Sequence, residues 1–350
     1  MIPKFSLQHF RFHLEPKGAL QMPAYNKGST LRLTPKGNVI RGGFGSTFRR
    51  IVCHSNCREP ETCDLRYVCP YTVVFHPFVP EGSEKISRNR DIPRPFVIKP
   101  PLETKETYLL GEPLSFDLVV IGKAKDYLPY FIVTFKELCQ FGLGRRRTAC
   151  ELAGVESVSV GGSTGPVYSA TDNMVRPPSG VIRWSDLLPP ESTNGKKETR
   201  RVKLRFLTPT TLKADGLVVR KLDFSHLIKR LRDRINAVGY FYCEEGLEIN
   251  FRAFGEEAER VKTVQDSTQW ADSTRYSRRR GVSHDLSGIV GEVVFEGDLS
   301  PFIPYLRLGE YLHVGKNAVF GNGWFKIEEI GRGFRKPQGF ICRKRSFERI

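Results

Sequence analysis

The chain carries one short pattern of residues twice, and this repetition restricts the folds that it can adopt. Val119 and Val293 each lie in an apolar run that is typical of a strand. Each run is followed by a segment typical of a helix start, LPYF at 128–131 and IPYL at 303–306. Each helix then leads to a Phe-Gly-x-Gly group, FGLG in the first copy and FGNG in the second. Because order and spacing agree within a few residues, two copies of one supersecondary plan are the simplest explanation.

Hydrophobic periodicity predicts the elements within each copy. The first copy predicts a strand over 5–14 with apolar residues on both faces, a short helix over 41–53 with arginines on its outer face, a strand over 116–121 and a helix over 128–138. The second copy predicts a strand over 202–206, a helix over 227–238 capped by Asp223 or Ser225, a strand over 290–295, a helix from Ser300 to about Leu308, and a strand over 324–330. Strand-helix-strand-strand-helix-strand, twice, predicts an α+β chain of two tandem ferredoxin-like (RRM-like) domains.

Irregular segments mark the expected domain boundaries. The first domain is predicted over residues 1–160, with a Pro-, Lys- and Arg-rich insertion from Pro77 to Pro113. Residues 161–198 are rich in Gly, Ser, Pro and Thr and are predicted to contain the linker, with a short docking helix at 184–188. The second domain is predicted over residues 199–350. A chain of 350 residues is long enough for two cores of this size.

The charge of the chain points to an anionic polymer as its partner. Lys and Arg number 55 against 38 Asp and Glu, which gives a formal net charge of +17. The positive residues cluster, as in Arg145-Arg146-Arg147 and Arg278-Arg279-Arg280, and such clusters favour a polynucleotide. The sequence shows no long apolar run for a membrane span and no signal-peptide pattern near Met1. We therefore expect a cytoplasmic protein whose cysteines stay mostly reduced.

A glycine-rich stretch from Gly309 to Phe325 is the most distinctive local motif. Its sequence, GEYLHVGKNAVFGNGWF, combines glycines with Lys316, and exposed backbone N–H groups beside a lysine form an anion-binding concavity. The stretch is not a Walker loop, because Gly309 and Gly315 are one residue too far apart and Asn317 stands where Ser or Thr should hold magnesium. We therefore predict contact with polynucleotide phosphates.

This stretch closely resembles the C-terminal glycine-rich motif of CRISPR-associated endoribonucleases that cut precursor CRISPR RNA, members of the repeat-associated mysterious protein (RAMP) superfamily. The resemblance extends to 275–297, to the strand-like RVKLRFLTPTT at 201–211, and to Pro23-Ala24-Tyr25 and 41–45 near the N-terminus. It implies the tandem ferredoxin-like fold. It also implies attack by the RNA 2′-hydroxyl on the adjacent phosphate, giving a 2′,3′-cyclic phosphate and a 5′-hydroxyl.

Metal-free RNA cleavage requires a base, an acid and a cation, and histidine suits the first two roles near neutral pH. In the resembled family the catalytic histidine, when present, lies on or just after the first helix, and His54 is the histidine in that place. Tyr25 and Lys27 are the predicted catalytic helpers. A metal ligand or an ordinary surface residue remains an alternative for His54. His9 and His13 lie on a strand and are expected to be structural.

The RNA-binding surface is expected to combine arginines, aromatic rings and the glycine-rich loop, because arginine binds phosphates and aromatic rings stack on bases. A solvated basic loop is the alternative for the 275–280 segment, and packing at a strand end is the alternative for His313. The predicted RNA-binding residues are Arg41, Arg49, Arg275, Tyr276, Arg278, Arg279, His313, Gly315, Lys316, Asn317, Phe320, Gly321 and Gly323.

Half of the eight cysteines cluster just after the first predicted helix. Cys53, Cys57, Cys63 and Cys69 have a spacing that matches no standard zinc ribbon or finger. Such clustering in a cytoplasmic protein still favours a structural Zn²⁺ site. Buried thiols in a compact loop are the alternative, and an iron–sulfur cluster is a weaker one.

The sequence thus predicts a metal-independent endoribonuclease that processes precursor CRISPR RNA without a catalytic cofactor. Its expected partners are CRISPR repeat RNA, other CRISPR effector subunits, and a second copy in a homodimer. Two alternatives stay open. One is a catalytically inactive RNA-binding subunit of a CRISPR effector complex, and the other is an unrelated RNA-binding protein stabilised by zinc.

Overall fold

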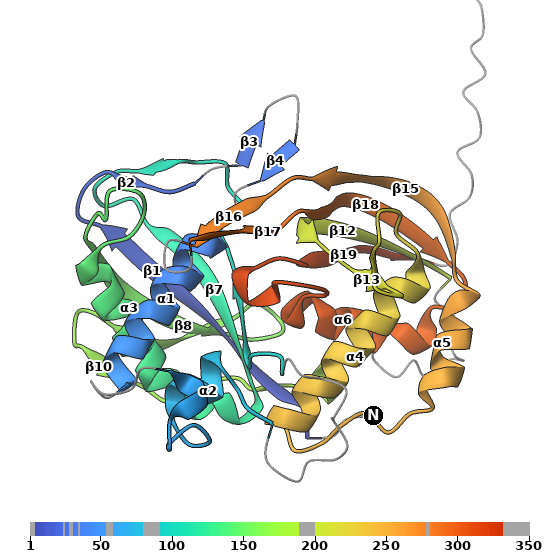
Figure 1. Ribbon diagram of the computed structural model, residues 1–350, viewed down its shortest axis with the longest axis horizontal. Helices are drawn as coiled ribbons and strands as arrows, with labels where there is room; N and C mark the ends of the chain where they lie inside the picture. Colours follow the sequence, from blue (N-terminus) through green and yellow to red (C-terminus); the bar gives the residue numbers. More distant parts are fainter. Residues whose placement is uncertain are drawn as a thin grey trace, which may run out of the picture.

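The first strand of the chain, β1 (Ser6–Pro16), lies inside a seven-stranded antiparallel sheet (Figure 1). The computed structural model describes residues 4–23, 25–27, 31–33, 36–53, 59–79, 92–188, 200–277 and 281–331. Side chains along β1 alternate between the two faces of the sheet. Phe10, Phe12 and Leu14 join a core with the helices, so His9 and Arg11 lie on the opposite face.

The first domain follows the ferredoxin-like plan. Its strands lie in the order β8-β1-β7-β5, so the last strand of the unit pairs with the first. The helices α1 and α3 cover one face of the sheet (Figure 1), and Phe44 stacks on Phe135 with 4.7 Å between ring centroids. The elements are β1, α1 (Gly37–Val52), β5 (Phe96–Lys99), β7 (Leu114–Ile121), α3 (Leu128–Phe141) and β8 (Cys150–Val158), with β9 (Thr164–Ser169), β10 (Met174–Val175) and β11 (Ile182–Arg183) added to the same sheet.

The second domain repeats the plan with the order β15-β18-β12-β19. Val202, Leu204 and Phe206 alternate along β12 and are buried, as their period of two predicts. Asp223 caps the first helix by accepting a hydrogen bond from the Ser225 N–H at 2.8 Å. The elements are β12 (Arg201–Thr210), α4 (Phe224–Tyr242), β15 (Lys262–Ala271), β18 (Gly288–Glu296), α6 (Ile303–Leu312) and β19 (Phe325–Gly331).

Small hairpins and short helices complete the described chain. The β16–β17 hairpin reaches from the second domain across to α1 (Figure 1). The described helices include none that is long and apolar enough to cross a membrane. The remaining elements are β2 (Leu20–Gln21), β3 (Tyr25–Lys27), β4 (Leu31–Leu33), β6 (Thr107–Tyr108), β13 (Lys213–Ala214), β14 (Leu217–Val218), β16 (Thr274–Ser277), β17 (Val282–Asp285), α2 (Pro70–Phe75), α5 (Phe251–Glu259) and the 3₁₀ turns η1 (Pro60–Thr62), η3 (Gly122–Tyr127), η4 (Trp184–Leu187), η5 (Ser300–Phe302) and η6 (Ala318–Phe320).

The two domains share an apolar core. Leu7, Val97 and Val119, on the sheet face of the first domain away from its helices, belong to the same buried cluster as the core of the second domain. The Tyr242 hydroxyl at the end of α4 donates to the Pro93 carbonyl at 2.9 Å. Because burial of apolar surface holds both domains, they are expected to move as one unit.

The tandem ferredoxin-like prediction is confirmed, and several details need correction. The predicted linker, 161–198, holds β9, β10 and β11, which pair within the first sheet. The predicted Pro77–Pro113 insertion contains β5, the second strand of the ferredoxin-like unit. Both errors arise because short strands surrounded by Gly and Pro carry little periodicity of their own.

The helix predictions differ mainly at their ends. The helix predicted over 41–53 begins earlier, at Gly37, and the one predicted to end near Leu308 continues to Leu312. Ser300 lies inside the turn η5 and does not cap a helix. The Phe-Gly groups of the two copies are not equivalent either. Phe141 is the last residue of α3, whereas Phe320 lies in η6, beyond the end of α6.

Candidate nucleic-acid interface

The glycine-rich loop folds tightly between the two domains. Gly321 and Gly323 both have positive φ, at 91° and 75°, where a side chain is strained. A Cβ on Gly321 would lie 2.5 Å from Pro100 Cδ of the first domain, and a Cβ on Gly323 would lie 1.9 Å from the Val314 carbonyl oxygen. These two positions therefore require glycine for close packing as well as for turning the chain.

Much of the loop backbone is hydrogen-bonded inside the protein. The N–H groups of Val314, Lys316 and Gly323 donate to the carbonyls of Gly323, Thr211 and Pro209, at 2.9, 3.1 and 3.0 Å. The Thr208 hydroxyl donates to the Gly321 carbonyl at 2.7 Å. The expectation that successive loop N–H groups are open to an anion is therefore wrong for these groups. Any anion contact by the loop depends more on side chains, and Lys316 is exposed.

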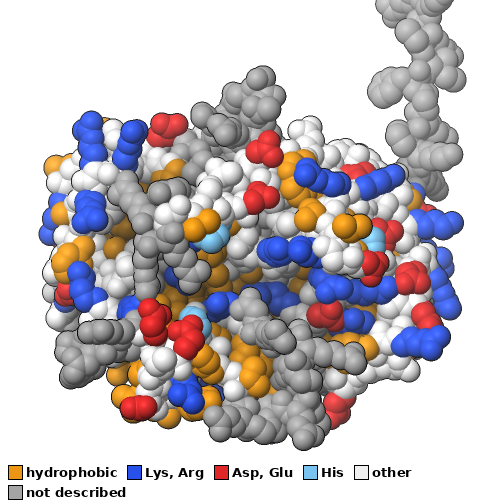
Figure 2. All heavy atoms as spheres, in the orientation of Figure 1, with side chains coloured by type: hydrophobic (Ala, Val, Ile, Leu, Met, Phe, Trp, Pro, Cys, Tyr) orange, Lys and Arg blue, Asp and Glu red, His pale blue; other side chains and the backbone are white. Residues whose placement is uncertain are grey.

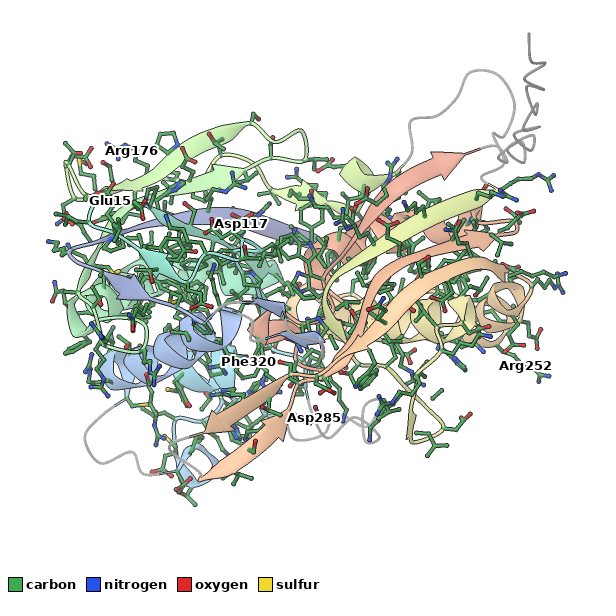
Figure 3. The ribbon with its side chains drawn as sticks, turned by 90° about the horizontal axis from the view of Figure 1, so that it is seen from above. Glu15, Asp117, Arg176, Arg252, Asp285 and Phe320 are labelled. Atoms are coloured by element: carbon green, nitrogen blue, oxygen red, sulfur yellow. The ribbon has the colours of Figure 1, made fainter. Side chains whose placement is uncertain are left out.

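Phe320 lies where the two domains meet, close to the start of the β16–β17 hairpin (Figure 3). The Arg275 guanidinium carbon from β16 lies 4.6 Å from the centre of the Phe320 ring, and the Arg41 guanidinium carbon from α1 lies 5.2 Å from it. The structure thus brings together three predicted RNA-binding residues from three distant parts of the sequence. We call Arg41, Arg275 and Phe320 the junction cluster.

Arg41 is the most unusual member of the junction cluster. Its guanidinium carbon also lies 4.7 Å from the centre of the Phe75 ring, and its Nε has no hydrogen-bond partner among the described residues. Burial lowers the pKa of Arg41 to about 10, and the positive charges of Arg94 and Arg275 act in the same direction. The prediction that α1 carries its arginines on its outer face is therefore wrong for Arg41. A partly buried cation in this setting is stabilised by an anion.

His313, predicted to contact RNA, is completely buried. Its ring stacks on Trp324 with 5.7 Å between centroids, and its Nδ1 lies 3.1 Å from the Asn322 carbonyl oxygen. Burial, with Lys99 and Arg234 nearby, holds the pKa of His313 well below its usual range. The neutral ring supports the loop from inside and does not reach a ligand, which agrees with the alternative of packing.

A buried charged network lies beside the loop on the far face of the first sheet. Asp117 on β7 accepts from Arg11 Nε at 2.8 Å, and its other oxygen lies 2.9 Å from His9 Nε2. Lys99 lies 4.8 Å from the centre of the Tyr311 ring, and burial lowers its pKa to about 8. His9 is structural, as the sequence predicted. The sequence predicts no special role for Lys99 or Asp117, because their sequence neighbours show only an ordinary strand.

Other predicted site residues lie wholly or partly outside the described part of the chain. His54, Cys57, Arg278 and Arg279 are outside it, and for Tyr25, Lys27 and Tyr276 the description is limited to the backbone. Arg49 lies over the Tyr71 ring at 5.6 Å.

The structure describes all of the clustered cysteines except Cys57. Cys53, Cys63 and Cys69 are partly buried, and Cys63 and Cys69 are free thiols. The described residues contain no group of three or more His, Cys, Asp or Glu placed to hold a metal ion. Because Cys57 is outside those residues, the zinc site stays a prediction.

Lys and Arg side chains gather in the middle of one face of the molecule (Figure 2). This region lies over the junction between the two domains, where the glycine-rich loop and α4 meet in Figure 1. Nearby aromatic rings and partly buried cations are the features with which proteins bind single-stranded nucleic acid. The arrangement can therefore hold a phosphate chain and stack a base.

Two family models match the chain. Residues 5–180 match the model of the AF_1859_N N-terminal domain, and residues 204–325 match the model of the CRISPR-associated endoribonuclease Cas6. A protein of Archaeoglobus fulgidus described as uncharacterized is 25% identical over 341 residues, covering 92% of this chain and 99% of that protein.

Solved structures share the fold. A Thermus thermophilus Cas6 superposes with a TM-score of 0.50 at 13% identity, covering 92% of this chain and 98% of that one. A Cas6 in a product complex gives 0.51 at 15% identity, covering 92% and 99%. A chain of a partial Cas6-RT-Cas1–Cas2 complex gives 0.54 at 11% identity, covering 95% of this chain and 48% of that one. At these identities the likeness establishes the tandem ferredoxin-like fold.

Proposed function

Because the chain belongs to the AF_1859_N family over its N-terminal half and is a Cas6-type protein of the RAMP group, we propose that it cleaves precursor CRISPR RNA within its repeats. The observation that carries the proposal is the junction cluster. Arg41, Arg275 and Phe320 meet beside the glycine-rich loop, and together they offer two cations and a ring to a phosphate and a base.

We place the reaction in the class of metal-independent acid–base cleavage. The 2′-hydroxyl oxygen attacks the adjacent phosphorus as a base removes its proton, and the 5′-oxygen leaves as it takes a proton from an acid. The products are a 2′,3′-cyclic phosphate and a 5′-hydroxyl. His54, Tyr25 and Lys27 are the proposed acid–base groups, and the resemblance of the sequence to the family supports this choice.

The charged side chains of the junction suit this chemistry. As the phosphorus becomes pentacoordinate, negative charge builds up on its oxygens, and Arg275 or Arg41 would stabilise that charge. Low exposure strengthens such stabilisation because less water screens it. Association with other CRISPR proteins and homodimer formation stay predictions.

The proposal is tested with labelled repeat RNA in EDTA. We expect cleavage to continue after brief chelation, and a single 2′-deoxy nucleotide just upstream of the cut should abolish cleavage while binding is retained. His54→Ala should slow the chemical step by roughly 10²–10⁴-fold if His54 is the acid or base. Cleavage that requires added Mg²⁺, or that proceeds on the 2′-deoxy substrate, would overturn the mechanism. Tight binding with no cleavage would instead identify an inactive RNA-binding subunit.

A further inference from the structure

A cavity of about 250 Å³ lies beside the glycine-rich loop, between α4 and the segment that follows β12. Its lining is mostly basic. The charged residues that line it are Lys213, Arg230, Asp233, Arg234 and Lys316. Four cations thus face one carboxylate in a space that is open to solvent.

The single carboxylate of the lining is already engaged. Asp233 Oδ1 lies 2.7 Å from Arg232 Nη2, and Asp233 Oδ2 lies 3.6 Å from Arg230 Nη1. Burial and the neighbouring Lys213 lower the pKa of Lys316, and Asp285 on β17 opposes this effect only in part. Lys213 and Lys316 both line the cavity and are exposed. Two ammonium groups held near each other attract an anion, since their mutual repulsion is then relieved.

Arg234 gives the cavity a buried donor. Its Nε donates to the Leu312 carbonyl at 2.8 Å, whereas its Nη2 has no hydrogen-bond partner among the residues described. Burial lowers the pKa of Arg234 to about 10. A buried donor without a partner is costly, and the planar guanidinium fits a phosphate with two parallel hydrogen bonds.

The cavity and the junction cluster lie at opposite ends of the glycine-rich loop. A Cβ on Gly315 would lie 2.4 Å from the Thr211 carbonyl oxygen of the second domain, whereas Gly321 packs on Pro100 of the first. A strand of RNA that stacks a base near Phe320 and follows the loop would therefore bring a neighbouring phosphate toward Lys316.

We propose that this cavity binds one backbone phosphate of the RNA, with Lys213, Arg234 and Lys316 as its ligands. The inference rests on the proposed function, because the polyanion is the RNA of that proposal. It adds Lys213 and Arg234, which neither the motif nor the junction cluster identifies, to the binding surface.

The test measures repeat RNA binding as a function of salt. Because both lysines bind the same phosphate, the Lys213→Gln, Lys316→Gln double variant should lower the slope of log Kd against log salt concentration by about 0.7, the value for one phosphate contact on a single strand, and each single variant should lower it by less. Lys17→Gln is the matched control, because Lys17 is exposed and paired with Glu151 on the first domain. Arg234→Gln should weaken binding roughly tenfold, and a thermal melt must show that this variant is folded.

A second arm locates the phosphate. A methylphosphonate, which carries no charge, is placed at each position of the repeat RNA in turn. One position should weaken binding to the wild type and have little effect on the Lys213→Gln, Lys316→Gln double variant.

The outcomes separate this inference from the proposed function. Unchanged salt slopes in folded variants that still bind RNA would overturn the phosphate site and leave the proposed function standing. Stabilisation by inorganic phosphate without any sensitive methylphosphonate position would assign the cavity to a free anion and overturn the RNA assignment. A wild-type protein that binds no repeat RNA would overturn both.

Discussion

Replacing Gly323 by alanine tests whether the glycine-rich loop depends on close packing. Both Gly323 and Gly216 have positive φ, at 75° and 82°, so alanine at either position is strained by roughly 1–2 kcal/mol. At Gly216, in the β13–β14 turn, a Cβ would meet nothing within 4 Å. At Gly323 it would lie 1.9 Å from the Val314 carbonyl oxygen. Gly216→Ala is therefore a control for the dihedral strain alone.

The extra cost at Gly323 follows from the hydrogen bonds that must break. The backbone has to shift, and this movement disturbs the bonds from the Val314 N–H to the Gly323 carbonyl and from the Gly323 N–H to the Pro209 carbonyl. Each buried group left without a partner costs about 1–3 kcal/mol. We expect Gly323→Ala to lower the free energy of unfolding by about 2–4 kcal/mol more than Gly216→Ala. For a domain of this size the extra loss of Tm is about 6–12 °C.

The assay is thermal and urea unfolding of both variants, followed by RNA binding of the folded fractions. Gly323→Ala should also weaken RNA binding, because the loop that positions Lys316 and Phe320 is displaced. Equal destabilisation by the two substitutions would refute the packing argument.

Three further predictions concern charged groups and metal. Burial opposes ionisation of the Asp117 carboxyl, but hydrogen bonds from His9 and Arg11 lower its pKa to about 2. The ionised carboxylate should therefore add about 2 kcal/mol to the free energy of unfolding above pH 4, and this contribution should be lost as the pH falls toward 2. Asp117→Asn should flatten the acid-unfolding curve over that window. Burial lowers the pKa of Lys99 from 10.5 to about 8. Between pH 8 and pH 10.5 the unfolded chain therefore binds a proton at Lys99 that the folded chain has lost, and the free energy of unfolding should rise with pH over this range. Lys99→Met should remove that rise in urea titrations followed across pH. Protein purified without chelator should contain about one equivalent of zinc if the cysteine cluster is a structural site, and Cys63→Ser should lower both zinc content and Tm; metal analysis that finds less than half an equivalent would contradict the site.

The sequence by itself predicted the repeated architecture. Apolar alternation along β12 and the helical spacing of α4 arise from local periodicity, and local periodicity is written in the order of the residues. The duplication of β7–α3 as β18–α6 was visible for the same reason. Short strands such as β11 are not predicted from the sequence, because pairing with a partner strand defines them and their own residues do not. The partner of β11 is β1.

The tertiary structure decided which of the candidate residues share a site. Arg41, Arg275 and Phe320 are far apart in sequence, and packing between α1, β16 and η6 brings them together. His313 is a residue type that often contacts ligands, yet the fold buries it against Trp324. In the sequence Arg234 is an ordinary arginine on a helix, and only the fold shows that its guanidinium is buried beside a basic cavity. Burial and charge depend on neighbours brought close by the fold, and these neighbours are set by long-range packing rather than by the adjacent sequence.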